Sequence, residues 1–539
     1  MPHEEVAQRG SIIRSNEIAR MVGGDIARRA ANRTPQKLAF IAPEQDEELT
    51  FEAFNRRVNR TAHAFQEEGL ERGDRLAIVG GNSLQFLTAY FGALKAGIIF
   101  TPINPEITAE DIGYELNHSE ADALLVDEVL YPKVEPLAAD RDIDILAAIT
   151  VGDEDSPVPS LHGVIDDQEP TEPVVEIHDE DIAQIMYTSG TTSRPKGVLL
   201  SHKAITTGSI NVSASTDLTR NDVISCMMPL FHCAQLTMVK GAMHVSATTV
   251  VRRSFDPDGF LEDVEQRDLT WSFMLPAMYN GLLARPDIED RDLSSLRYCL
   301  YAMAPIGNET LEQAIETFDA DFALASGQTE AYPPTCVYHP EWQLEKEGNY
   351  WGHAAANTDI AIMDDDGNLL DRGEVGEIVY RGPNVMDGYL KNEEATEEAF
   401  AHGWFHSGDM GFFDEDDLLK FVDRKKDIIK SGGENVSTQK VESMLLDHPA
   451  VEELAVVGIP HEHWGEAVTA FVIPAEGPDA DTEDIREYAR KRLAGFESPK
   501  AVEFVEELPK TATGKIQKFQ LAEREAEYYR ERDDKQAEG

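Results

Sequence analysis

A run of small and hydroxyl residues between two apolar segments is the first feature that could do chemistry. In YTSGTTSRPKGV (residues 187–198), Ser, Thr and Gly occupy six consecutive positions, and Arg-Pro-Lys-Gly follows. Gly190 and the hydroxyl residues would let backbone N–H groups approach an anion closely, and Lys196 adds positive charge. The stretch is not a Walker A loop, because its lysine precedes the second glycine. By itself it indicates either a phosphate-binding loop or a plain hairpin loop.

The segments around this stretch predict the elements that must position it. Apolar runs at residues 182–187 and 198–200 lead into and out of it, and both are typical of strands. Upstream, extended and helical patterns alternate. We predict strands at 75–79, 97–102 and 121–126 and helices at 83–96 and 109–117. Strand–helix–strand alternation predicts parallel sheets with helices on both faces.

A second, smaller unit is expected after a charged stretch that ends in two glycines, DRKKDIIKSGG (423–433). Ser437 could cap a helix that ends at Leu446, a strand follows at 454–458, and Asp481 could open another helix. Residues 501–505 are strand-like, and the charged last residues predict a helix that frays. We therefore predict two domains, residues 1–424 and residues 425–539.

The charge of the chain excludes several classes of partner. It holds 100 acidic and 48 basic residues, for a net charge of -52, spread along its whole length. Nucleic acid and anionic membranes require basic surface, so neither is an expected partner. We interpret the acidity as adaptation to a high-salt cytoplasm, where a Debye length of about 3 Å at 1 M salt screens surface repulsion.

The cysteines and the apolar runs fit the same compartment. The four cysteines show no C-x-x-C spacing, which argues against a zinc site or a disulfide framework. No signal peptide opens the chain. The longest apolar run, residues 86–103, is interrupted by Lys95 and predicts a buried helix and a strand instead of a membrane span. Oligomeric state cannot be predicted from these features.

Six motifs then occur in one order. They are YTSGTTSRPKGV (187–198), MPLFH (228–232), SGQTE (326–330), GWFHSGDMG (403–411), DRKKDIIKSGGENVS (423–437) and LPKTATGKIQK (508–518). In this order they resemble the adenylate-forming (AMP-binding) ligases, a family that includes acyl-CoA synthetases, and the resemblance covers nearly the whole chain. It implies an α/β fold: a large N-terminal domain of parallel and mixed sheets with flanking helices, and a smaller, mobile α+β C-terminal domain.

The resemblance also implies a reaction and its participants. ATP would activate a carboxylic acid as acyl-AMP with release of pyrophosphate, and coenzyme A would then receive the acyl group. Residues 188–192 would bind the β- and γ-phosphates, Thr188 and Glu330 would help to hold Mg²⁺, and Asp409 would bind the ribose. Lys515 would bring its ammonium group to the α-phosphate. Taken alone, Glu330 is explained equally well as a helix N-terminal acid, whereas Asp409 alone would indicate a turn residue and Lys515 alone a surface lysine.

The predicted site residues follow from these motifs. The ATP- and AMP-binding set is Thr188, Ser189, Gly190, Thr191, Thr192, Lys196, Thr329, Glu330, Asp409, Arg424, Lys430 and Lys515, with Thr188, Glu330 and Lys515 as the catalytic members. Lys426 is expected to be the hinge, and the thiol of coenzyme A is expected to approach along Ser431, Gly432 and Gly433. Lys510 and Lys518 are expected to be solvated.

The acyl pocket is expected to be largely apolar. Its predicted lining is His232, Leu236, Ala302, Met303, Ala304 and Ala325. No Asp is placed to receive an α-amino group, so a medium- or long-chain fatty acid or an aromatic acid is favoured over an amino acid. For His232 and Cys233, a packed core position explains the residue type equally well.

Three positions depart from the family pattern. Ser193 replaces a usual Gly, Ser326 replaces a common adenine-stacking Tyr, for which Tyr301 could substitute, and Met303 replaces a common Gly. None of the three removes a charged group. Two alternatives to an acyl-CoA synthetase remain: an enzyme that loads a carrier-protein thiol, and a non-catalytic paralogue that binds nucleotide or acyl ligand. The second would be expected to lack Lys515, Glu330 or Asp409.

Overall fold

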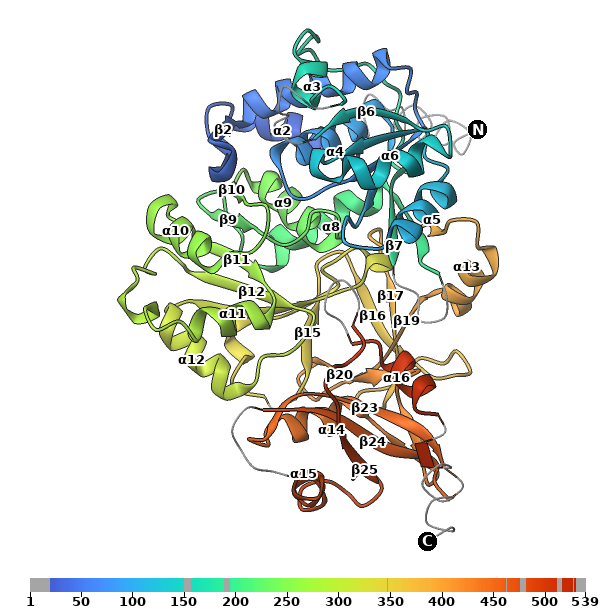
Figure 1. The fold of residues 1–539 in the computed structure, drawn as a ribbon. Coiled ribbons are helices and arrows are strands. Elements are labelled where there is room, and N and C mark those ends of the chain that lie inside the picture. The colour runs from blue at the N-terminus through green and yellow to red at the C-terminus, as the bar shows by residue number, and fades with distance from the viewer. Residues whose placement is uncertain are drawn as a thin grey trace, which may run out of the picture. The chain divides into compact units, whose positions relative to one another are not determined.

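The computed structural model describes residues 20–149, 157–188, 194–346, 348–461, 463–475, 481–510, 516–526 and 528–529. Of these, the first of two compact units holds the residues up to 188 together with 194–360 and 380–405. The second unit holds residues 361–379 and those from 406 onward. Figure 1 labels the elements of the chain and colours them by residue number. The domain boundary expected at residue 424 lies inside the second unit and stays a prediction.

A seven-stranded sheet of the first unit carries the predicted phosphate loop. Its strands are β3 (Arg75–Val79), β4 (Ile99–Ile103), β5 (Ala123–Val126), β6 (Asp144–Ala148), β7 (Ile182–Thr188), β8 (Lys196–Ser201) and β18 (Gly388–Tyr389). They lie in the order β18-β8-β7-β4-β3-β5-β6. The strands from β7 to β6 are parallel, and β8 and β18 each pair antiparallel with their neighbour.

The neighbouring sheet of this unit is mostly parallel. Its strands are β1 (Leu38–Ala42), β2 (Glu47–Thr50), β9 (Val223–Cys226), β10 (Thr248–Val251), β11 (Trp271–Met274), β12 (Tyr298–Ala302), β13 (Asp321–Ser326), β14 (Cys336–Tyr338) and β15 (Tyr350–Ala354). They lie in the order β2-β1-β10-β9-β11-β12-β13-β14-β15. The ends of β12 and β13 therefore lie side by side, with Ala302 opposite Ala325.

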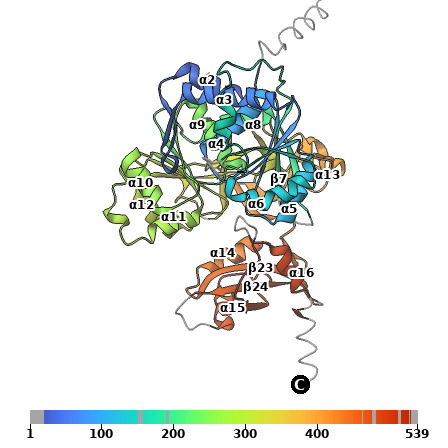
Figure 2. The same cartoon turned by 45° about the horizontal axis from the view of Figure 1, so that its top comes forward.

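Helices fill the space around both sheets. They are α2 (Asp25–Arg33), α3 (Phe51–Glu67), α4 (Leu84–Ala96), α5 (Ala109–Ser119), α6 (Tyr131–Ala139), α7 (Leu161–Ile165), α8 (His202–Ser215), α9 (Cys233–Val245), α10 (Pro257–Arg267), α11 (Pro276–Leu283), α12 (Asn308–Phe318) and α13 (Glu393–Ala399). In Figure 2, α4, α8 and α9 lie in the middle of the unit, between α10–α12 on one side and α5, α6 and α13 on the other.

The position of α4 in the middle of the unit explains why apolar residues occur all around this helix. All of its residues are buried, so it presents apolar side chains in every direction and not along one stripe. Its one charge, Lys95, is satisfied by Asn55, Asn59 and Glu172, whose carboxylate oxygen lies 2.6 Å from the Lys95 Nζ. The expected buried helix and strand in residues 86–103 are thus confirmed as α4 and β4. Along the described part of the chain, none of the helices combines the length and apolar character that crossing a membrane requires.

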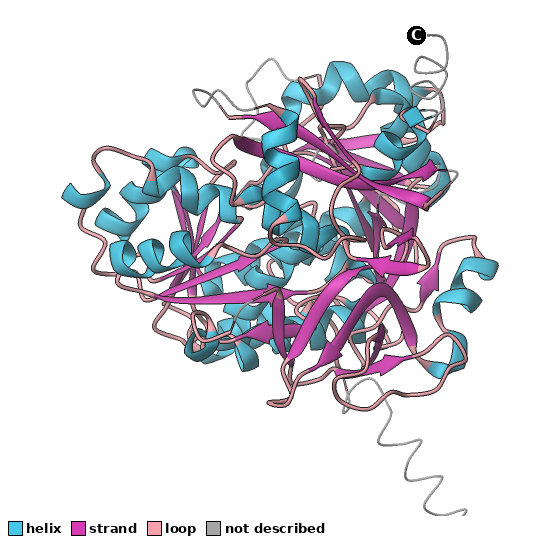
Figure 3. Ribbon diagram, turned by 90° about the horizontal axis from the view of Figure 1, so that it is seen from below, coloured by secondary structure: helices cyan, strands magenta, loops and turns pink. Residues whose placement is uncertain are grey.

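The second unit contains a five-stranded mixed sheet with helices on both faces. The strands of this sheet are β21 (Ile429–Ser431), β22 (Glu434–Val436), β23 (Val451–His461), β24 (Gly465–Pro474) and β25 (Ala501–Phe504), in the order β22-β21-β24-β23 with β25 beside β24. The helices are α14 (Thr438–Leu446), α15 (Thr482–Arg490) and α16 (Lys518–Arg524), and an antiparallel pair outside this sheet, β19 (Phe405–Phe413) and β20 (Leu419–Arg424), precedes them. The chain before them contains β16 (Asp359–Met363) and β17 (Gly376–Arg381). Figure 3 shows helices and strands intermixed throughout the chain, which confirms the α/β class.

The core of the second unit follows the alternation of strand side chains. In β23, Leu454 and Val456 face a cluster that includes residues of α14 and α15, whereas Ala455 and Val457 face a cluster that includes Leu521 of α16. The predicted helix starts are confirmed. Ser437 caps α14, and Asp481 forms a capping box at α15.

Candidate active site

The two strands beside the predicted phosphate loop form an antiparallel hairpin. Thr188, the last residue of β7, lies opposite Lys196, the first residue of β8. Both residues are half-buried. The predicted ligands Ser189, Gly190, Thr191 and Thr192, and the departure Ser193, lie outside the described residues. Both alternatives for this segment, a plain hairpin loop and a phosphate-binding loop, require its two ends to lie together. The pairing of β7 with β8 places them so.

Tyr389 contacts both a cation, Lys196, and a carboxylate, Glu330. The Lys196 Nζ lies 4.5 Å from the centre of the Tyr389 ring, and the Tyr389 hydroxyl donates a 3.1 Å hydrogen bond to the Glu330 Oε1. Glu330 lies in the single helical turn Thr329–Ala331 after β13, and its carbonyl oxygen accepts a 2.7 Å hydrogen bond from the Met386 N–H. Burial raises the pKa of Tyr389, so its hydroxyl stays a proton donor.

Sequence reasoning missed Tyr389. It lies in β18, opposite Val198 of β8, and its two partners are far from it in the chain. No local motif marks such a residue.

The predicted acyl-pocket residues come from α9 and the ends of β12 and β13. His232 precedes α9 and caps it, because its Nδ1 accepts a hydrogen bond from the Ala234 N–H at 3.3 Å. Leu236 and Ala325 are buried. Cys233 links this helix to the Glu330 turn, since its Sγ lies 3.5 Å from the Thr329 Oγ1. The capping and packing roles expected as alternatives for His232 and Cys233 are therefore present.

Met303 occupies an unusual backbone conformation for a long side chain. Its φ angle is 77°, in the left-handed region, and 63% of its surface is exposed. A glycine would adopt this conformation without strain. Ala304 is also exposed, whereas Ala302 is half-buried. Tyr301, a possible substitute for the adenine-stacking residue, is buried and donates a 2.7 Å hydrogen bond to the Gln343 Oε1.

In the second unit, the two residues expected at the ribose form a cross-strand ion pair. Asp409 of β19 lies opposite Arg424 of β20, and the Arg424 Nε lies 2.6 Å from the Asp409 Oδ1. Asp409 is buried, and its own N–H donates to the Ser407 Oγ at 3.0 Å. The pair holds a carboxylate and a guanidinium in a defined orientation relative to each other.

The glycine pair of the predicted hinge segment forms a two-residue hairpin loop. Gly432 and Gly433 connect β21 and β22 with φ angles of 64° and 89°. Positive φ at both positions is typical of the tight turn that suits antiparallel strands. The Gly432 N–H donates to the Trp464 carbonyl oxygen at 2.8 Å, and a side chain at Gly432 would meet the Trp464 ring at 3.2 Å. Ser431 before the turn is buried.

The lysines of this unit have varied surroundings. Lys426 and Lys430 are exposed, and the Lys430 N–H donates to the Glu466 Oε2 at 2.7 Å. Lys515 lies outside the described residues. The expectation that Lys518 is solvated is wrong, because its Nζ lies 2.8 Å from the Glu442 Oε1 and its side chain is 13% exposed. Lys510 is more exposed and pairs with Glu453 at 2.7 Å.

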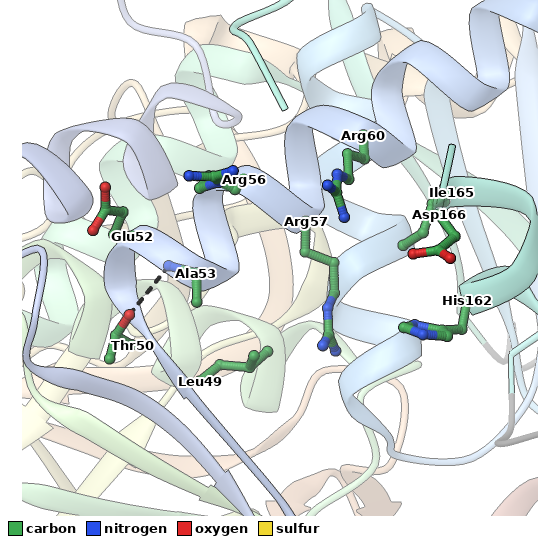
Figure 4. A pocket seen from close by; sticks show the side chains of 10 residues that line it. All are labelled: Leu49, Thr50, Glu52, Ala53, Arg56, Arg57, Arg60, His162, Ile165 and Asp166. Carbon is green, nitrogen blue, oxygen red and sulfur yellow. Dashed lines mark hydrogen bonds between the residues drawn. The ribbon is translucent and has the colours of Figure 1, made fainter. Parts of the chain in front are cut away.

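The structure also contains a cavity of about 380 Å³ beside α3 and α7. Figure 4 shows Arg57 and Arg60 of α3 on one wall and His162 and Asp166 on the other. The Arg57 guanidinium is already paired with Glu47. None of the predicted site residues lines this cavity.

Comparisons with known proteins identify the family. The model of the AMP-binding enzyme family matches residues 27–390, and the model of its C-terminal domain matches residues 440–515. A feruloyl-CoA synthase from Amycolatopsis sp. is 37% identical over 477 residues, which covers 88% of this chain and 94% of that protein. A long-chain-fatty-acid–CoA ligase from Mycobacterium tuberculosis is 32% identical over 500 residues, with 93% and 98% covered.

A solved structure shows the same fold. The crystal structure of ATP-bound MatB from Rhodopseudomonas palustris superimposes with a TM-score of 0.85 at 27% identity, and the match covers 94% of this chain and 99% of that one. The order of the motifs, the arrangement of the strands and the similarity to these relatives all indicate the same family. The chain therefore belongs to the AMP-binding enzyme family, and it is an acid–thiol ligase of the acyl-CoA synthetase type that acts on ATP and coenzyme A.

Proposed function

We propose that the protein converts an apolar carboxylic acid, a medium- or long-chain fatty acid or an aromatic acid, into its acyl-CoA in two steps. In the first, a carboxylate oxygen attacks the α-phosphorus of ATP, the bond to the β-phosphate breaks, and pyrophosphate leaves. In the second, the thiol sulfur of coenzyme A attacks the acyl carbon, AMP leaves, and the thiol proton is released. The first attack brings two anionic groups together, and in the second AMP leaves as an anion, so the site must supply positive charge and hydrogen-bond donors in both steps.

The observation that carries the proposal is the arrangement around Tyr389. One phenol ring contacts Lys196 through its face and Glu330 through its hydroxyl. A cation, a carboxylate and the end of a Thr- and Gly-rich loop are what binding of a metal–triphosphate requires. In this proposal Lys196 binds a terminal phosphate, Thr329 and Glu330 line the nucleotide side, and Tyr389 holds Lys196 and Glu330 apart so that they do not neutralise each other.

The donors also fit Mg²⁺. Thr188 and Glu330 offer hard oxygen atoms, and one of the two Glu330 oxygens is not used by Tyr389. Clusters of three or more His, Cys, Asp or Glu side chains suited to a metal are absent from the described residues. An ion held by Thr188 and Glu330 would therefore take its remaining ligands from phosphate and water, as Mg²⁺ commonly does. When bound, Mg²⁺ would neutralise phosphate charge.

The second unit supplies the remaining roles in the proposal. Asp409 accepts hydrogen bonds from the ribose hydroxyls, and Arg424 orients its carboxylate. Lys515 neutralises the charge that develops at the α-phosphate, and Lys430 contacts the adenylate. A domain comprising residues 425–539 then turns about Lys426, and Ser431 with the Gly432–Gly433 turn lines the approach of the thiol.

The substrate class follows from the lining of the acyl side. Leu236, Ala302 and Ala325 are apolar, and Leu236 and Ala325 are buried. The names of the relatives cover an aromatic acid and long-chain fatty acids, so they support this class and do not choose within it. The exposed Met303 is flexible enough to accommodate either shape.

The experiment that tests the proposal is pyrophosphate release in molar KCl with ATP and Mg²⁺, over a panel of fatty and aromatic acids, with and without coenzyme A. Acid-dependent release together with AMP and an acyl-CoA product would confirm the reaction and name the substrate. Acid-dependent release without thioester would favour a carrier-protein thiol as the acceptor. A panel that gives no release while ATP still binds would contradict the proposed substrate class.

Replacing Asp409 tests the ribose contact. We expect Asp409→Ala to raise the KM for ATP about 10- to 100-fold, because a carboxylate accepting two hydroxyl hydrogen bonds is lost. The KM for coenzyme A should stay unchanged. Asp365→Ala is the matched control, since Asp365 also pairs with a cation of this unit, the Lys425 Nζ at 2.8 Å. An unchanged KM for ATP in Asp409→Ala would refute the ribose role.

The net charge of -52 leads to a prediction about salt. We propose that the protein works in a high-salt cytoplasm. The Debye length falls from about 10 Å at 0.1 M salt to about 3 Å at 1 M, so like charges repel strongly only in dilute buffer. We expect the midpoint of thermal unfolding, followed by circular dichroism, to rise by at least 10 °C or so between 0.1 and 2 M KCl. Equal midpoints would exclude adaptation to high salt.

A further inference from the structure

One helix of the first unit contacts both ends of the predicted phosphate loop. Helix α5 lies beside the seven-stranded sheet and presents Tyr114, Glu115 and His118 toward it. The side chains of Tyr114 and His118 are one helical turn apart and stack, with ring centres 5.3 Å apart and planes inclined by 20°. They therefore form one continuous surface on the helix.

The first loop end is bound through Tyr187, the residue before Thr188. Its hydroxyl donates a 3.2 Å hydrogen bond to the Glu115 carbonyl oxygen and lies 3.0 Å from the His118 Nδ1. A hydroxyl has one proton to donate. When that proton goes to the Glu115 carbonyl, the contact with His118 is made by the ring tautomer that donates from Nδ1. Burial lowers the pKa of His118, which keeps the ring neutral at physiological pH.

The second loop end is bound through the residues before Lys196. The Tyr114 hydroxyl donates a 3.2 Å hydrogen bond to the Pro195 carbonyl oxygen. The Arg194 guanidinium lies 4.8 Å from the centre of the Tyr114 ring, a cation–π distance. Tyr114 therefore holds, by two different interactions, the two residues through which the chain re-enters β8.

A third contact joins the same helix to the strand that carries Tyr389. The Lys391 Nζ donates to the His118 carbonyl oxygen at 2.9 Å and pairs with Glu120 at 2.9 Å. The last carbonyl groups of a helix have no partner within the helix, so a cation here stabilises its C-terminus. Lys391 follows Tyr389 by two residues. The end of α5 thereby contacts the chain beside the Lys196–Tyr389–Glu330 cluster.

We propose that α5 is a clamp that positions Thr188 and Lys196 for ATP, with Tyr187, His118, Tyr114 and Lys391 as positioning residues. The proposal rests on the proposed function, in which these two residues bind phosphate or Mg²⁺. The register of β7 and β8 already sets Thr188 opposite Lys196, so the clamp is not needed to form the hairpin. What its side-chain contacts add is resistance to movement at the residues next to the binding groups, where a displacement of about 1 Å weakens catalysis strongly.

The test compares variants that remove single clamp contacts. Tyr187→Phe removes both hydrogen bonds of the phenol and keeps the ring. We expect the KM for ATP in pyrophosphate release to rise about 3- to 10-fold, the range for one or two lost hydrogen bonds, while the KM for the acid changes less than twofold. His118→Ala should give the same increase. His118→Asn, whose side-chain amide can donate near the Nδ1 position, should restore most of the affinity.

A matched control separates positioning from general loss of stability. Tyr279→Phe, in α11, also removes a hydroxyl that makes two contacts, with the Ser272 Oγ at 2.8 Å and the Leu300 carbonyl oxygen at 3.1 Å. It should lower the unfolding midpoint at least as much as Tyr187→Phe and leave the KM for ATP unchanged. A KM shift in Tyr187→Phe no larger than in Tyr279→Phe, or an absent rescue by His118→Asn, would overturn the clamp.

Hydrogen exchange gives a readout that does not depend on the reaction. Amide exchange in peptides covering residues 182–188 and 194–201 should be faster in Tyr187→Phe and in Lys391→Met than in the unmodified protein, and Lys391→Arg should restore slow exchange. An inactive unmodified protein with these exchange differences would reject the proposed function and retain the anchoring of the loop ends. An active protein whose exchange and KM for ATP are unaffected by the substitutions would reject the clamp alone.

Discussion

The Lys515→Ala variant is expected to lose pyrophosphate release by about 100- to 1,000-fold, the usual effect of removing one charged group that stabilises a transition state. The acid carboxylate and the α-phosphate are both anionic, and in the proposed mechanism the Lys515 ammonium group offsets their repulsion. Thioester formation from supplied acyl-AMP and coenzyme A should change less than threefold or so, because in the proposed mechanism the turn about Lys426 withdraws Lys515 from the site before that step.

The control for Lys515→Ala is Lys510→Ala, five residues upstream in the same motif. Lys510 pairs with Glu453 at 2.7 Å, so its loss removes the same charge from the chain but only a surface ion pair. We expect both half-reactions of Lys510→Ala to stay within about twofold of the unmodified protein. An equal loss of both half-reactions in Lys515→Ala would contradict the division of roles between the two steps.

Two buried histidines are expected to dominate unfolding in acid. Burial lowers the pKa of His202 to about 4 and that of His244 to about 3, from 6.5 when exposed. In the neutral form, each ring makes a hydrogen bond through one of its nitrogen atoms. The His202 Nδ1 accepts from the Gly23 N–H at 3.2 Å, and the His244 Nε2 lies 2.9 Å from the Ser209 Oγ. Protonation would place an uncompensated charge beside the cores of α8 and α9.

The direction of the pH effect follows from the lowered values. Above pH 6.5 both rings are neutral in the folded and the unfolded chain, and stability is complete. As pH falls from 6.5, the unfolded chain binds protons first, so the free energy of unfolding decreases until the folded pKa of each ring is reached. At about 1.4 kcal/mol for each pKa unit, the losses are of order 3 and 5 kcal/mol for His202 and His244. These values are comparable with the total stability of a domain.

Glu115 opposes this effect over part of the range. Burial raises its pKa to about 8 from 4.5, so stability increases as pH falls from 8 to 4.5. Between pH 6.5 and 4.5 one buried carboxyl therefore offsets one histidine. Below pH 4.5 no compensation by Glu115 is left, and the free energy of unfolding should fall most steeply with pH there.

The measurement is urea unfolding in molar KCl at pH values from 7 to 3.5. His202→Asn keeps an acceptor near the Nδ1 position, and His244→Gln keeps a polar group near the Nε2 position. Neither amide takes up a proton in this pH range, so each variant removes one buried positive charge with limited loss of hydrogen bonds. Each should show a shallower fall of unfolding free energy with pH, whatever its stability at pH 7. His162→Asn, at an exposed position, should leave the slope unchanged. Parallel slopes in all four proteins would rule out the buried histidines as the cause.

Much of the fold was predictable from local patterns. The strand at residues 75–79 and the helix that follows it are β3 and α4, and Ser437 and Asp481 begin helices as expected. These elements depend on the period of apolar residues and on capping side chains, both of which are local. The same holds for the hairpin strands beside residues 189–193, since two apolar runs flank a Gly- and Thr-rich stretch.

Contacts between distant residues were not predictable. Tyr389 was missed because its partners, Lys196 and Glu330, come from separate parts of the chain. Lys518 was expected in solvent, yet the packing of α16 against the sheet brings it to Glu442. Local patterns also say nothing of α5 contacting both loop ends, because Tyr114 and Tyr187 approach each other only when β7 takes its place in the sheet.

Hydrophobic period, capping residues and ordered motifs are written along the chain, so the main elements, the family and the residue types of the proposed site could be predicted without the fold. The contacts between distant side chains came from the folded chain: Tyr389 between Lys196 and Glu330, Asp409 against Arg424, and α5 against both ends of the loop. The reason is that sheet order and register are global properties, and a contact across strands depends on every connection that folds between them.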